Sequence, residues 1–557
     1  MSAIIPIPPI APLPLPSDRY NLLIEFAVKH LDFQRAELAS VLDVYGIILG
    51  SVDCQVVSLP NEGKEASCVY NGKTRQCTRP FLLLSFTRHF QGTRFHLGEE
   101  KLDKKVGIAN VLARCTLVRS VVELWGIGVS IETCAASVKE YVKSTEIGKA
   151  NWEKQSKPDL SWKSTIHTLG SKFSREEQDE MRAKFAFLAF KGNVQMIEPH
   201  NEFILIHEVE MDSMGSPLFP KHRTDTDLVN PDCGVRPPLA VYYGRILGDR
   251  SVKGRGGVEQ YNLKKRVYLG PTSMDAELSF VMANLGQVEE GSYVMDPFVG
   301  TGSILLSCAI KGAYCIGTDI DLRVLRGKGT CENVRSNFEQ FGLPRPELVR
   351  SDNSIYSRHF RTHAAIYDAI VCDPPYGIRA GARKTGSRLE DPRPILDEHR
   401  YDHIAQTKPY NVSDVMADLL DMAACTLVMH GRLVYVIPSF CDFDKATDLP
   451  RHECLDFVHC CYQPFTNELG RRMVTMKKVR DYDPLLRDEY MSNVWKNGAE
   501  SAEKCANIRE KIMEAARKKP GYEGKAAIRK EKRKVHKDAK KKAKLRLNSE
   551  ENPSFVE

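Results

Sequence analysis

The segment of this chain best suited to chemistry is Asp373, Pro374, Pro375 and Tyr376. It follows the apolar run 369–372, which is typical of a buried strand. Proline restricts the backbone, so the Asp carboxylate and a backbone carbonyl would form a rigid pair of hydrogen-bond acceptors beside an aromatic ring. Such a site suits a planar group that carries an NH2, for example the edge of a nucleobase. An Asp-Pro pair also opens many ordinary turns, so a structural role stays open.

A second segment, 296–302, lies upstream and reads Asp-Pro-Phe-Val-Gly-Thr-Gly. It follows a short apolar run, and the pattern predicts a strand, a glycine turn and then a helix over 303–310. Glycines let the backbone approach a ligand closely, and the N-terminus of a helix offers free N–H groups. Dinucleotide, phosphate and adenosylmethionine sites share this pattern, and a tight turn that binds nothing also fits it.

Polar side chains also follow the next two predicted strands. Asp319 and Ile320 end one of them, and Asp352 and Asn353 come at the end of the other. Ligands of open α/β sheets bind at the carboxyl ends of the strands, where a carboxylate can accept from ribose hydroxyls. The sequence therefore predicts one ligand pocket formed by four consecutive strand ends.

The glycine turn and the Asp-Pro-Pro-Tyr segment together resemble the adenosylmethionine-dependent amino-methyltransferases, which methylate exocyclic nitrogens. Three more segments, 243–247, 269–275 and 377–381, narrow the resemblance. They read Tyr-Gly-Arg-Ile-Leu, Leu-Gly-Pro-Thr-Ser-Met-Asp and Gly-Ile-Arg-Ala-Gly. These segments are similar to the THUMP-containing family of eukaryotic tRNA (guanosine-10-N2)-methyltransferases. The similarity covers residues 240–478, and the region before them has no equally sharp motif.

The resemblance implies a fold, a cofactor and partners. The fold would be α/β: a Rossmann-like class I methyltransferase domain with a mostly parallel seven-stranded sheet, preceded by an α+β ferredoxin-like and THUMP-like RNA-binding module. The cofactor would be S-adenosyl-L-methionine, and the product would be N2-methylguanosine at position 10 of tRNA. A small zinc-binding methyltransferase activator would form a heterodimer with this chain.

The same resemblance implies roles for individual residues. Asp373 and the Pro374 carbonyl would each accept one N–H of the target amine, and Tyr376 would stack on the flipped base. Asp352 would meet the adenine amine, with Asn353 as a helper. The expected catalytic residues are Asp373, Pro374, Pro375 and Tyr376. The expected cofactor-binding residues are Thr272, Ser273, Asp296, Phe298, Gly300, Thr301, Gly302, Asp319, Ile320, Asp352, Asn353 and Asp373, with no metal ligand.

Two other functions are compatible with the sequence. An adenine N6-methyltransferase acting on RNA or DNA would use the same acceptor motif. A non-catalytic RNA-binding subunit that keeps a methyltransferase fold is the second alternative. Polar residues at every strand end argue against the non-catalytic subunit, whereas the choice between guanine and adenine depends on the resemblance.

A long polar segment, 379–410, follows the Asp-Pro-Pro-Tyr motif. Loops of this length are usually functional or disordered. The segment carries Arg379, Arg383 and Lys384, which we expect to bind the phosphates of the substrate. A solvated insertion is the alternative interpretation.

The chain is expected to divide into six parts. These are a disordered Pro-rich stretch (1–18), a ferredoxin-like domain (19–90), a THUMP-like RNA-binding domain (91–225), a linker (226–240), the methyltransferase domain (241–490) and a basic tail (491–557). In the first half, apolar spacing predicts a helix over 22–31 and helical structure over 106–124.

The distribution of charge makes the tail the basic part of the protein. The 557 residues carry a formal net charge of +7, and residues 501–550 hold 18 Lys and Arg against 7 Asp and Glu. Such a tail could contact phosphates or serve in nuclear targeting, and a solvated tail is the alternative. The sequence has no CxxC pair, no basic leader and no apolar run of ~20 residues. We therefore expect reduced thiols, no membrane span and a cytoplasmic location, with the nucleus as the alternative.

Overall fold

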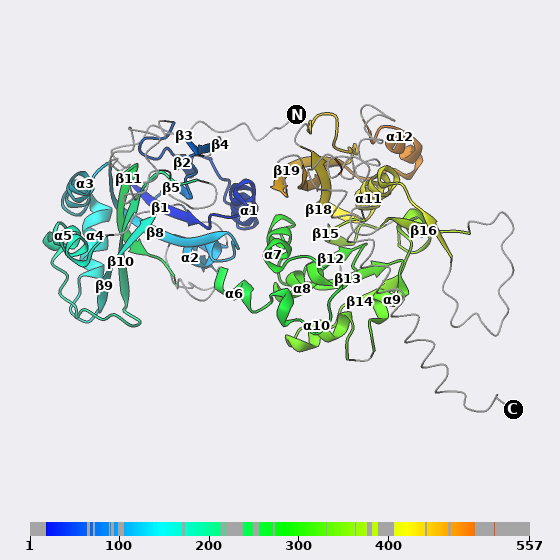
Figure 1. Ribbon diagram of the computed structural model, residues 1–557, viewed down its shortest axis with the longest axis horizontal. Coiled ribbons are helices and arrows are strands. Elements are labelled where there is room, and N and C mark those ends of the chain that lie inside the picture. The colour runs from blue at the N-terminus through cyan, green and yellow to red at the C-terminus, as the bar shows by residue number, and fades with distance from the viewer. Residues whose placement is uncertain are drawn as a thin grey trace.

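Two seven-stranded sheets form the two halves of the protein (Figure 1). The computed structural model describes residues 18–63, 67–70, 73–88, 90, 94–97, 105–169, 173–212, 218, 238–248, 255–270, 273–329, 331–362, 364–375, 381–387, 406–440, 443–465, 469–495 and 517. The N-terminal sheet and its helices lie on the left of Figure 1, and the second sheet with its helices lies on the right.

The first sheet is mainly antiparallel. Its strands are β1 (Arg19–Phe26), β2 (Cys54–Val57), β5 (Phe81–Thr87), β8 (Val118–Gly128), β9 (Trp162–Leu169), β10 (Asn201–Glu208) and β11 (Ala240–Ile246). They lie in the order β2-β5-β1-β8-β11-β10-β9. Its helices are α1 (Leu31–Val44), α2 (Ile108–Leu112), α3 (Ile131–Ser144), α4 (Glu146–Gln155) and α5 (Arg175–Ala183). Short pairs join β3 (Ser67–Tyr70) to β4 (Lys73–Gln76) and β6 (Phe95–His96) to β7 (Val106–Gly107).

This single sheet differs from the predicted division of the N-terminal half. The start of β8 pairs with β1 and its end pairs with β11, so no boundary falls at residue 90. Ala240–Ile246 belongs to this sheet as β11, although the sequence placed 241–246 at the start of the methyltransferase domain. The predicted linker lies almost wholly outside the described residues. Strand partners far apart in sequence leave no local signal, which is why the division was misplaced.

One predicted helix in this half is a strand, and another is helical over only part of its length. Residues 19–26 form β1, and most of 106–124 is divided between the short helix α2 and β8. Both β1 and β8 are central strands and are buried along almost their entire length. A strand covered on both faces has a continuous apolar run, which sequence periodicity cannot distinguish from a buried helix.

The second sheet confirms the predicted parallel fold. Its strands are β12 (Tyr293–Asp296), β13 (Tyr314–Asp319), β14 (Glu347–Arg350), β15 (Tyr367–Cys372), β18 (Leu427–Phe440), β19 (Leu455–Pro464) and β20 (Leu469–Lys478). They lie in the order β14-β13-β12-β15-β18-β20-β19. The first five are parallel, whereas β20 is antiparallel to β18 and forms a hairpin with β19.

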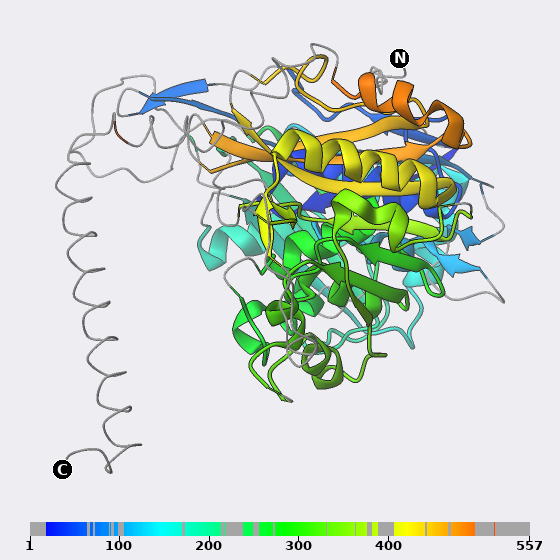
Figure 2. The ribbon, with the colours of Figure 1, turned by 90° about the vertical axis from the view of Figure 1, so that its right-hand side faces the viewer.

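Helices cover both faces of this sheet. They are α7 (Ala276–Leu285), α8 (Ser303–Ile310), α9 (Leu322–Arg326), α10 (Val334–Gln340), α11 (Val412–Thr426) and α12 (Arg487–Ser492), with α6 (Arg255–Glu259) before them. Val294 packs into the cluster that holds residues of α7, α8 and α10, and its neighbour Met295 packs into the cluster around α11. Figure 2 shows α11, in yellow, lying along the sheet. Both sides of β12 are therefore buried, as parallel sheets require.

The two halves share one hydrophobic core at the contact between α1 and α7. Phe33 and Ala36 of α1 belong to the same buried cluster as Val281 and Leu285 of α7. Figure 1 shows α1 and α7 at the junction between the halves. The halves are therefore packed together rather than tethered only by their connecting segment.

Buried polar contacts fix the orientation of this junction. The guanidinium of Arg432 on β18 donates to Asp43 Oδ2 at 2.9 Å and to Ser40 Oγ at 3.0 Å, both on α1. Ser40 Oγ also lies 3.1 Å from His459 Nε2 on β19. Each contact therefore joins a strand of the second sheet to α1 in the N-terminal half.

His459 should make the stability of this junction depend on pH. Burial lowers the pKa of His459 from 6.5 to about 4, with the nearby Arg432 cation lowering it further and Asp43 opposing the change. Below pH 6.5 the unfolded chain takes up a proton that the folded protein does not, so stability falls as the pH decreases toward 4. We expect this group to remove about 2 kcal/mol of unfolding free energy between pH 7.5 and 5.0.

Urea denaturation of the wild type and His459→Gln at both pH values would measure this effect. The loss between pH 7.5 and 5.0 should be smaller in His459→Gln by that amount. The exposed His359 offers a matched control, since His359→Gln should keep the loss seen in the wild type. An equal loss in the wild type and His459→Gln would contradict the prediction.

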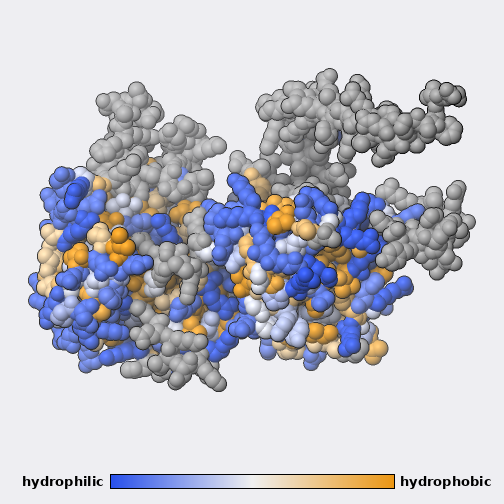
Figure 3. Space-filling model, turned by 90° about the horizontal axis from the view of Figure 1, so that it is seen from below, coloured by the Kyte–Doolittle hydropathy of each residue, from blue (hydrophilic) through white to orange (hydrophobic). Residues whose placement is uncertain are grey.

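The face of the described residues seen in Figure 3 is mixed in character. In the view of Figure 3, hydrophilic side chains predominate and hydrophobic ones are scattered among them. Within the described ranges, no helix is both long and apolar enough to cross a bilayer.

Candidate active site

A cavity of about 650 Å³ opens at the carboxyl ends of β12, β13, β14 and β15. Parallel strands bring these ends to one edge of the sheet, so segments far apart in sequence meet there. The wall also includes residues that precede α7 and residues of the β19–β20 hairpin. Its lining includes Ser273, Met274, Asp296, Phe298, Gly300, Thr301, Ser303, Asp319, Ile320, Asn353, Asp373, Pro374, Pro375, Arg383, Phe465 and Arg471. Residues from the ends of four strands therefore line one cavity.

The glycine turn after β12 brings the backbone to the cavity. Gly300 and Gly302 have φ of 49° and 78°, in the left-handed region that favours glycine. A Cβ at Gly302 would lie 2.7 Å from Val334 Cγ1, so the turn could not close on α10 with a side chain there. Of the two glycines, only Gly300 lines the cavity.

Asp296 is the most deeply buried acid of the site. Its Oδ1 accepts the N–H of Phe298 at 2.9 Å. Burial raises the pKa of Asp296 well above its usual value, and the carboxylates of Asp319 and Asp373 raise it further. Three carboxyl groups around one cavity favour a cationic ligand, because a nearby cation would stabilise their charged forms.

Asp319 at the end of β13 is held by backbone amides. Its Oδ2 accepts from Gly300 N at 3.1 Å and its Oδ1 accepts from Asp321 N at 2.9 Å. Burial raises the pKa of Asp319, and these hydrogen bonds partly offset the increase. A carboxylate fixed in this way has further lone pairs, so Asp319 could still accept hydrogen bonds from ligand hydroxyls.

Asn353, rather than Asp352, lies at the cavity wall after β14. The Asp352 carboxylate accepts from Ser354 N at 2.9 Å and from Thr385 N at 2.5 Å, and Asp352 does not line the cavity. Burial would raise the pKa of Asp352, but these hydrogen bonds outweigh it and lower the pKa. The buried amide of Asn353 has no hydrogen-bond partner among the described residues. We expected Asp352 to contact the cofactor with Asn353 as a helper, whereas Asn353 is the residue that lines the cavity.

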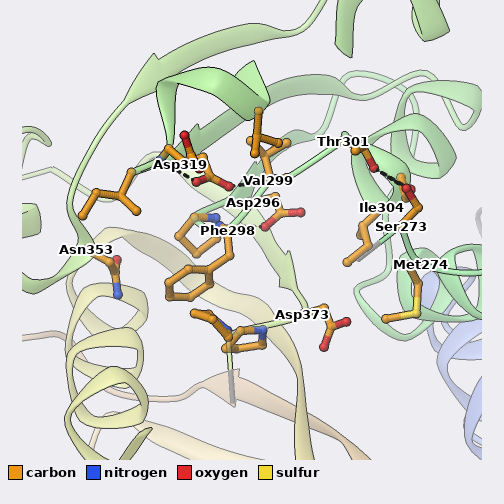
Figure 4. A pocket seen from close by; sticks show the side chains of 18 of the residues that line it. Ser273, Met274, Asp296, Phe298, Val299, Thr301, Ile304, Asp319, Asn353 and Asp373 are labelled. Carbon is orange, nitrogen blue, oxygen red and sulfur yellow. Dashed lines mark hydrogen bonds between the residues drawn. The ribbon is translucent and has the colours of Figure 1, made fainter. Parts of the chain in front are cut away.

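Asp373 lies on the side of the cavity away from Asp319, as Figure 4 shows. Its Oδ2 lies 3.9 Å from Arg471 Nη1 on β20. The Arg471 guanidinium also donates to Gln463 Oε1 at 2.7 Å and lies 5.4 Å from the centre of the Phe465 ring. Three contacts therefore hold the Arg471 guanidinium beside the Asp373 carboxylate.

Only some of the remaining predicted site residues line the cavity. Thr272, Tyr376 and Arg379 lie outside the described residues. Arg383 lines the cavity and donates to the Thr407 carbonyl at 2.5 Å, linking β16 (Arg383–Thr385) to β17 (Thr407–Pro409). Lys384 does not line it: its Nζ lies 3.8 Å from Asp414 Oδ2 and 5.0 Å from the ring centre of Tyr410.

The described wall fits S-adenosylmethionine, the cofactor that the resemblance implies. The unpartnered amide of Asn353 would suit an adenine edge, and Asp319 would suit ribose hydroxyls. The carboxylates around Asp296 would suit the positive sulfonium and ammonium groups. Figure 4 shows Asn353 and the Ser273–Thr301 hydrogen-bonded pair on opposite sides of the cavity, with Asp296 between them.

Sequence reasoning missed several residues of the wall. Met274, Phe465 and Arg471 all line the cavity. Phe465 and Arg471 flank the tip of the β19–β20 hairpin, which ends the second sheet. Arg471 Nη1 lies 3.9 Å from Asp373 Oδ2, just after β15, and the sequence holds no local signal for a contact between segments so far apart.

Comparisons with known proteins find matches to both halves of the chain. Residues 84–222 match the family described as the Tmrp11 THUMP N-terminal domain, and residues 264–392 match the RMKL-like methyltransferase domain. The chain is 33% identical to the tRNA (guanine(10)-N(2))-methyltransferase TRMT11 of Homo sapiens over 85% of this chain and 90% of that protein. It is 46% identical to TRMT11 of Dictyostelium discoideum over 45% of this chain and 49% of that protein.

Among solved structures, TrmN of Thermus thermophilus is similar, with 13% identity, a TM-score of 0.35, and coverage of 83% of this chain and 100% of that one. The relatives found by sequence establish the family, because the identity to the human protein extends over most of the length of both chains. The chain belongs to the TRMT11 family of tRNA (guanine(10)-N(2))-methyltransferases.

Proposed function

We propose that this protein transfers a methyl group from S-adenosylmethionine to the exocyclic N2 of guanosine 10 in tRNA. The observation that carries the proposal is that Asp373 and Pro374 line the same cavity as Asp296, Asp319 and Asn353. The hydrogen-bond acceptors for the amine therefore line the same cavity as the residues that fit the cofactor. Membership of the TRMT11 family supports the guanine N2 assignment over adenine N6.

The reaction requires an amine that is oriented and a methyl donor that is activated. S-adenosylmethionine supplies the electrophilic methyl group on a sulfonium, which leaves as a neutral thioether. The Asp373 carboxylate and the Pro374 carbonyl accept the two N–H groups of guanine N2, which directs the nitrogen lone pair toward the donor. The prolines hold these acceptors in place, so little reorganisation is needed. Asp373 can then take up the proton that the methylated nitrogen releases.

A nucleoside analysis tests the proposal. The protein is incubated with labelled S-adenosylmethionine and unmodified tRNA, and the tRNA is digested to nucleosides. Label in N2-methylguanosine is the expected result. Label in N6-methyladenosine would contradict the guanine assignment, and the absence of label in the presence of an activator subunit would favour a non-catalytic RNA-binding role.

We also propose the partner that the family resemblance implied and the cytoplasmic location that we expected from the sequence. A small zinc-binding activator protein would form a heterodimer with this chain, and the complex would be cytoplasmic. Affinity purification of the chain from its own cells, followed by mass spectrometry and fractionation, would test both. Purification without such a protein, or a purely nuclear distribution, would contradict the respective part.

Arg471 should be important for the methyl transfer step. Its guanidinium lies 3.9 Å from the Asp373 carboxylate and holds it near the cavity, so its loss should misplace an acceptor of the amine. We expect Arg471→Ala to lower the single-turnover rate about 10- to 100-fold while leaving the affinity for S-adenosylhomocysteine nearly unchanged.

The neighbouring Arg472 gives a matched control for Arg471. Its guanidinium packs over the rings of Phe443 and Tyr462 and donates to Ser439 Oγ at 3.0 Å, away from Asp373. Arg472→Ala should therefore change the rate much less in the same rapid-quench assay. Equal rates for Arg471→Ala and Arg472→Ala would show that the contact to Asp373 is unimportant.

A further inference from the structure

A buried arginine lies just behind the cavity and plays no part in the roles described so far. Arg266 is only 6% exposed, and its Nη2 has no hydrogen-bond partner in the described part of the chain. Its Nε donates to the Tyr261 carbonyl at 3.2 Å, and its Nη1 donates to Ser303 Oγ at 2.8 Å. Ser303 is the first residue of α8 and lines the cavity.

Three hydroxyl groups extend from Arg266 along this wall. Ser303 Oγ lies 3.4 Å from Thr301 Oγ1, which lies 2.7 Å from Ser273 Oγ. All three residues line the cavity. Because Arg266 donates to Ser303 Oγ, the hydroxyl hydrogen of Ser303 stays available to donate to a ligand. The row therefore offers O–H donors with a cation behind them.

No described carboxylate neutralises Arg266. Asp275 exerts the attraction that raises the pKa of Arg266, but its Oδ1 caps α7 by accepting from Glu277 N at 3.0 Å and Leu278 N at 3.4 Å. Burial outweighs that attraction and lowers the pKa of Arg266 to about 10, so the guanidinium is charged near neutral pH. A buried cation is costly unless an anion pairs with it. The cavity beside Ser303 is where a ligand could supply that anion.

We propose that Arg266, together with Ser303, binds the carboxylate of the amino-acid part of the cofactor. This inference rests on the proposed use of S-adenosylmethionine and adds a residue to its site. The placement agrees with the direction of the cavity, since Figure 4 shows the Ser273–Thr301 pair on the side away from Asn353. The adenosyl part then lies toward Asn353 and Asp319, and the amino-acid part lies toward α8 and Arg266.

Calorimetric titration with two ligands tests the proposal. S-adenosylhomocysteine carries the amino-acid part, whereas 5′-methylthioadenosine lacks it. Replacing Arg266 by alanine should weaken S-adenosylhomocysteine binding about 10- to 100-fold and leave 5′-methylthioadenosine binding within about twofold. Lys264→Ala, which removes a nearby exposed cation, is the matched control and should change neither affinity. An equal loss for both ligands in Arg266→Ala would show a structural role and overturn the proposal, as would unchanged binding of S-adenosylhomocysteine.

A change in the ligand avoids any effect of the substitution on folding. S-adenosylhomocysteine with its carboxylate converted to a carboxamide should bind the wild-type protein about tenfold more weakly than the parent compound. Equal affinities of the wild type for these two ligands would overturn the role of Arg266. Failure of the wild type to bind S-adenosylhomocysteine at all would instead contradict the proposed cofactor, and this inference with it.

Discussion

Replacing Asp373 by alanine is expected to lower the rate of methyl transfer about a thousandfold. The substitution removes one of two acceptors for the target amine and the group that takes up its proton. The residues suited to the cofactor lie on other strand ends, at Asp319 and Asn353. The affinity for S-adenosylhomocysteine should therefore stay within about threefold of the wild type.

Single-turnover kinetics and calorimetry together check the Asp373 prediction. Asp373→Asn is the matched variant, because it keeps the shape and one acceptor oxygen but cannot take up a proton. Its rate should lie between those of the wild type and Asp373→Ala. A rate within tenfold of the wild type for Asp373→Ala would refute the role of the carboxylate. A parallel collapse of cofactor affinity would show that Asp373 mainly shapes the pocket.

Replacing Glu37 by alanine should destabilise the whole protein. Glu37 on α1 is completely buried and accepts from Thr116 N at 2.8 Å, Leu117 N at 2.9 Å and Asn284 Nδ2 at 2.6 Å. Asn284 belongs to α7, so this carboxyl group joins the two halves. Burial raises the pKa of Glu37, and the three hydrogen bonds partly counteract it. Its removal leaves the buried Thr116 and Leu117 N–H groups without a partner and takes one of its two acceptors from Asn284 Nδ2, which still donates to the Arg114 carbonyl at 2.9 Å. This loss should cost about 3–5 kcal/mol of unfolding free energy.

Urea denaturation and scanning calorimetry check the Glu37 prediction. Because the halves share a core, we expect one cooperative transition in the wild type. Glu37→Ala should lower the midpoint and separate the unfolding of the two halves. Glu140→Ala, on the exposed side of α3, is a matched control that should change stability by less than about 0.5 kcal/mol. Equal stability of Glu37→Ala and wild type would contradict the shared junction.

The sequence predicted the parts of the site that depend on local chemistry. Asp296, Asp319 and Asp373 each follow an apolar strand, and parallel strands necessarily bring such residues to one edge. The glycines at 300 and 302 could be assigned to a turn because glycine adopts positive φ more readily than other residues. Both glycines have positive φ in the structure. The alternation of strands and helices also predicted the mostly parallel arrangement of the second sheet.

The parts that sequence reasoning missed depend on contacts between distant segments. The pairing of β8 with both β1 and β11 merges two predicted domains into one sheet, and no local pattern encodes it. Asp352 and Asn353 are neighbours of similar polarity, and only the contact of Asp352 with Thr385 shows which of them faces away from the cavity. Arg471 reaches Asp373 through a hairpin that begins about eighty residues later, a separation at which sequence spacing carries no information.

The central claim is that the Asp373–Pro374 acceptors act on the N2 amine of guanosine 10. Inosine differs from guanosine only in lacking that amine. Two tRNA transcripts, one with guanosine and one with inosine at position 10, can be compared in single-turnover methylation with labelled S-adenosylmethionine and the activator subunit. We predict N2-methylguanosine in the first transcript and no label at position 10 in the second. Methylation of inosine 10, or equal labelling of the two transcripts, would contradict the account.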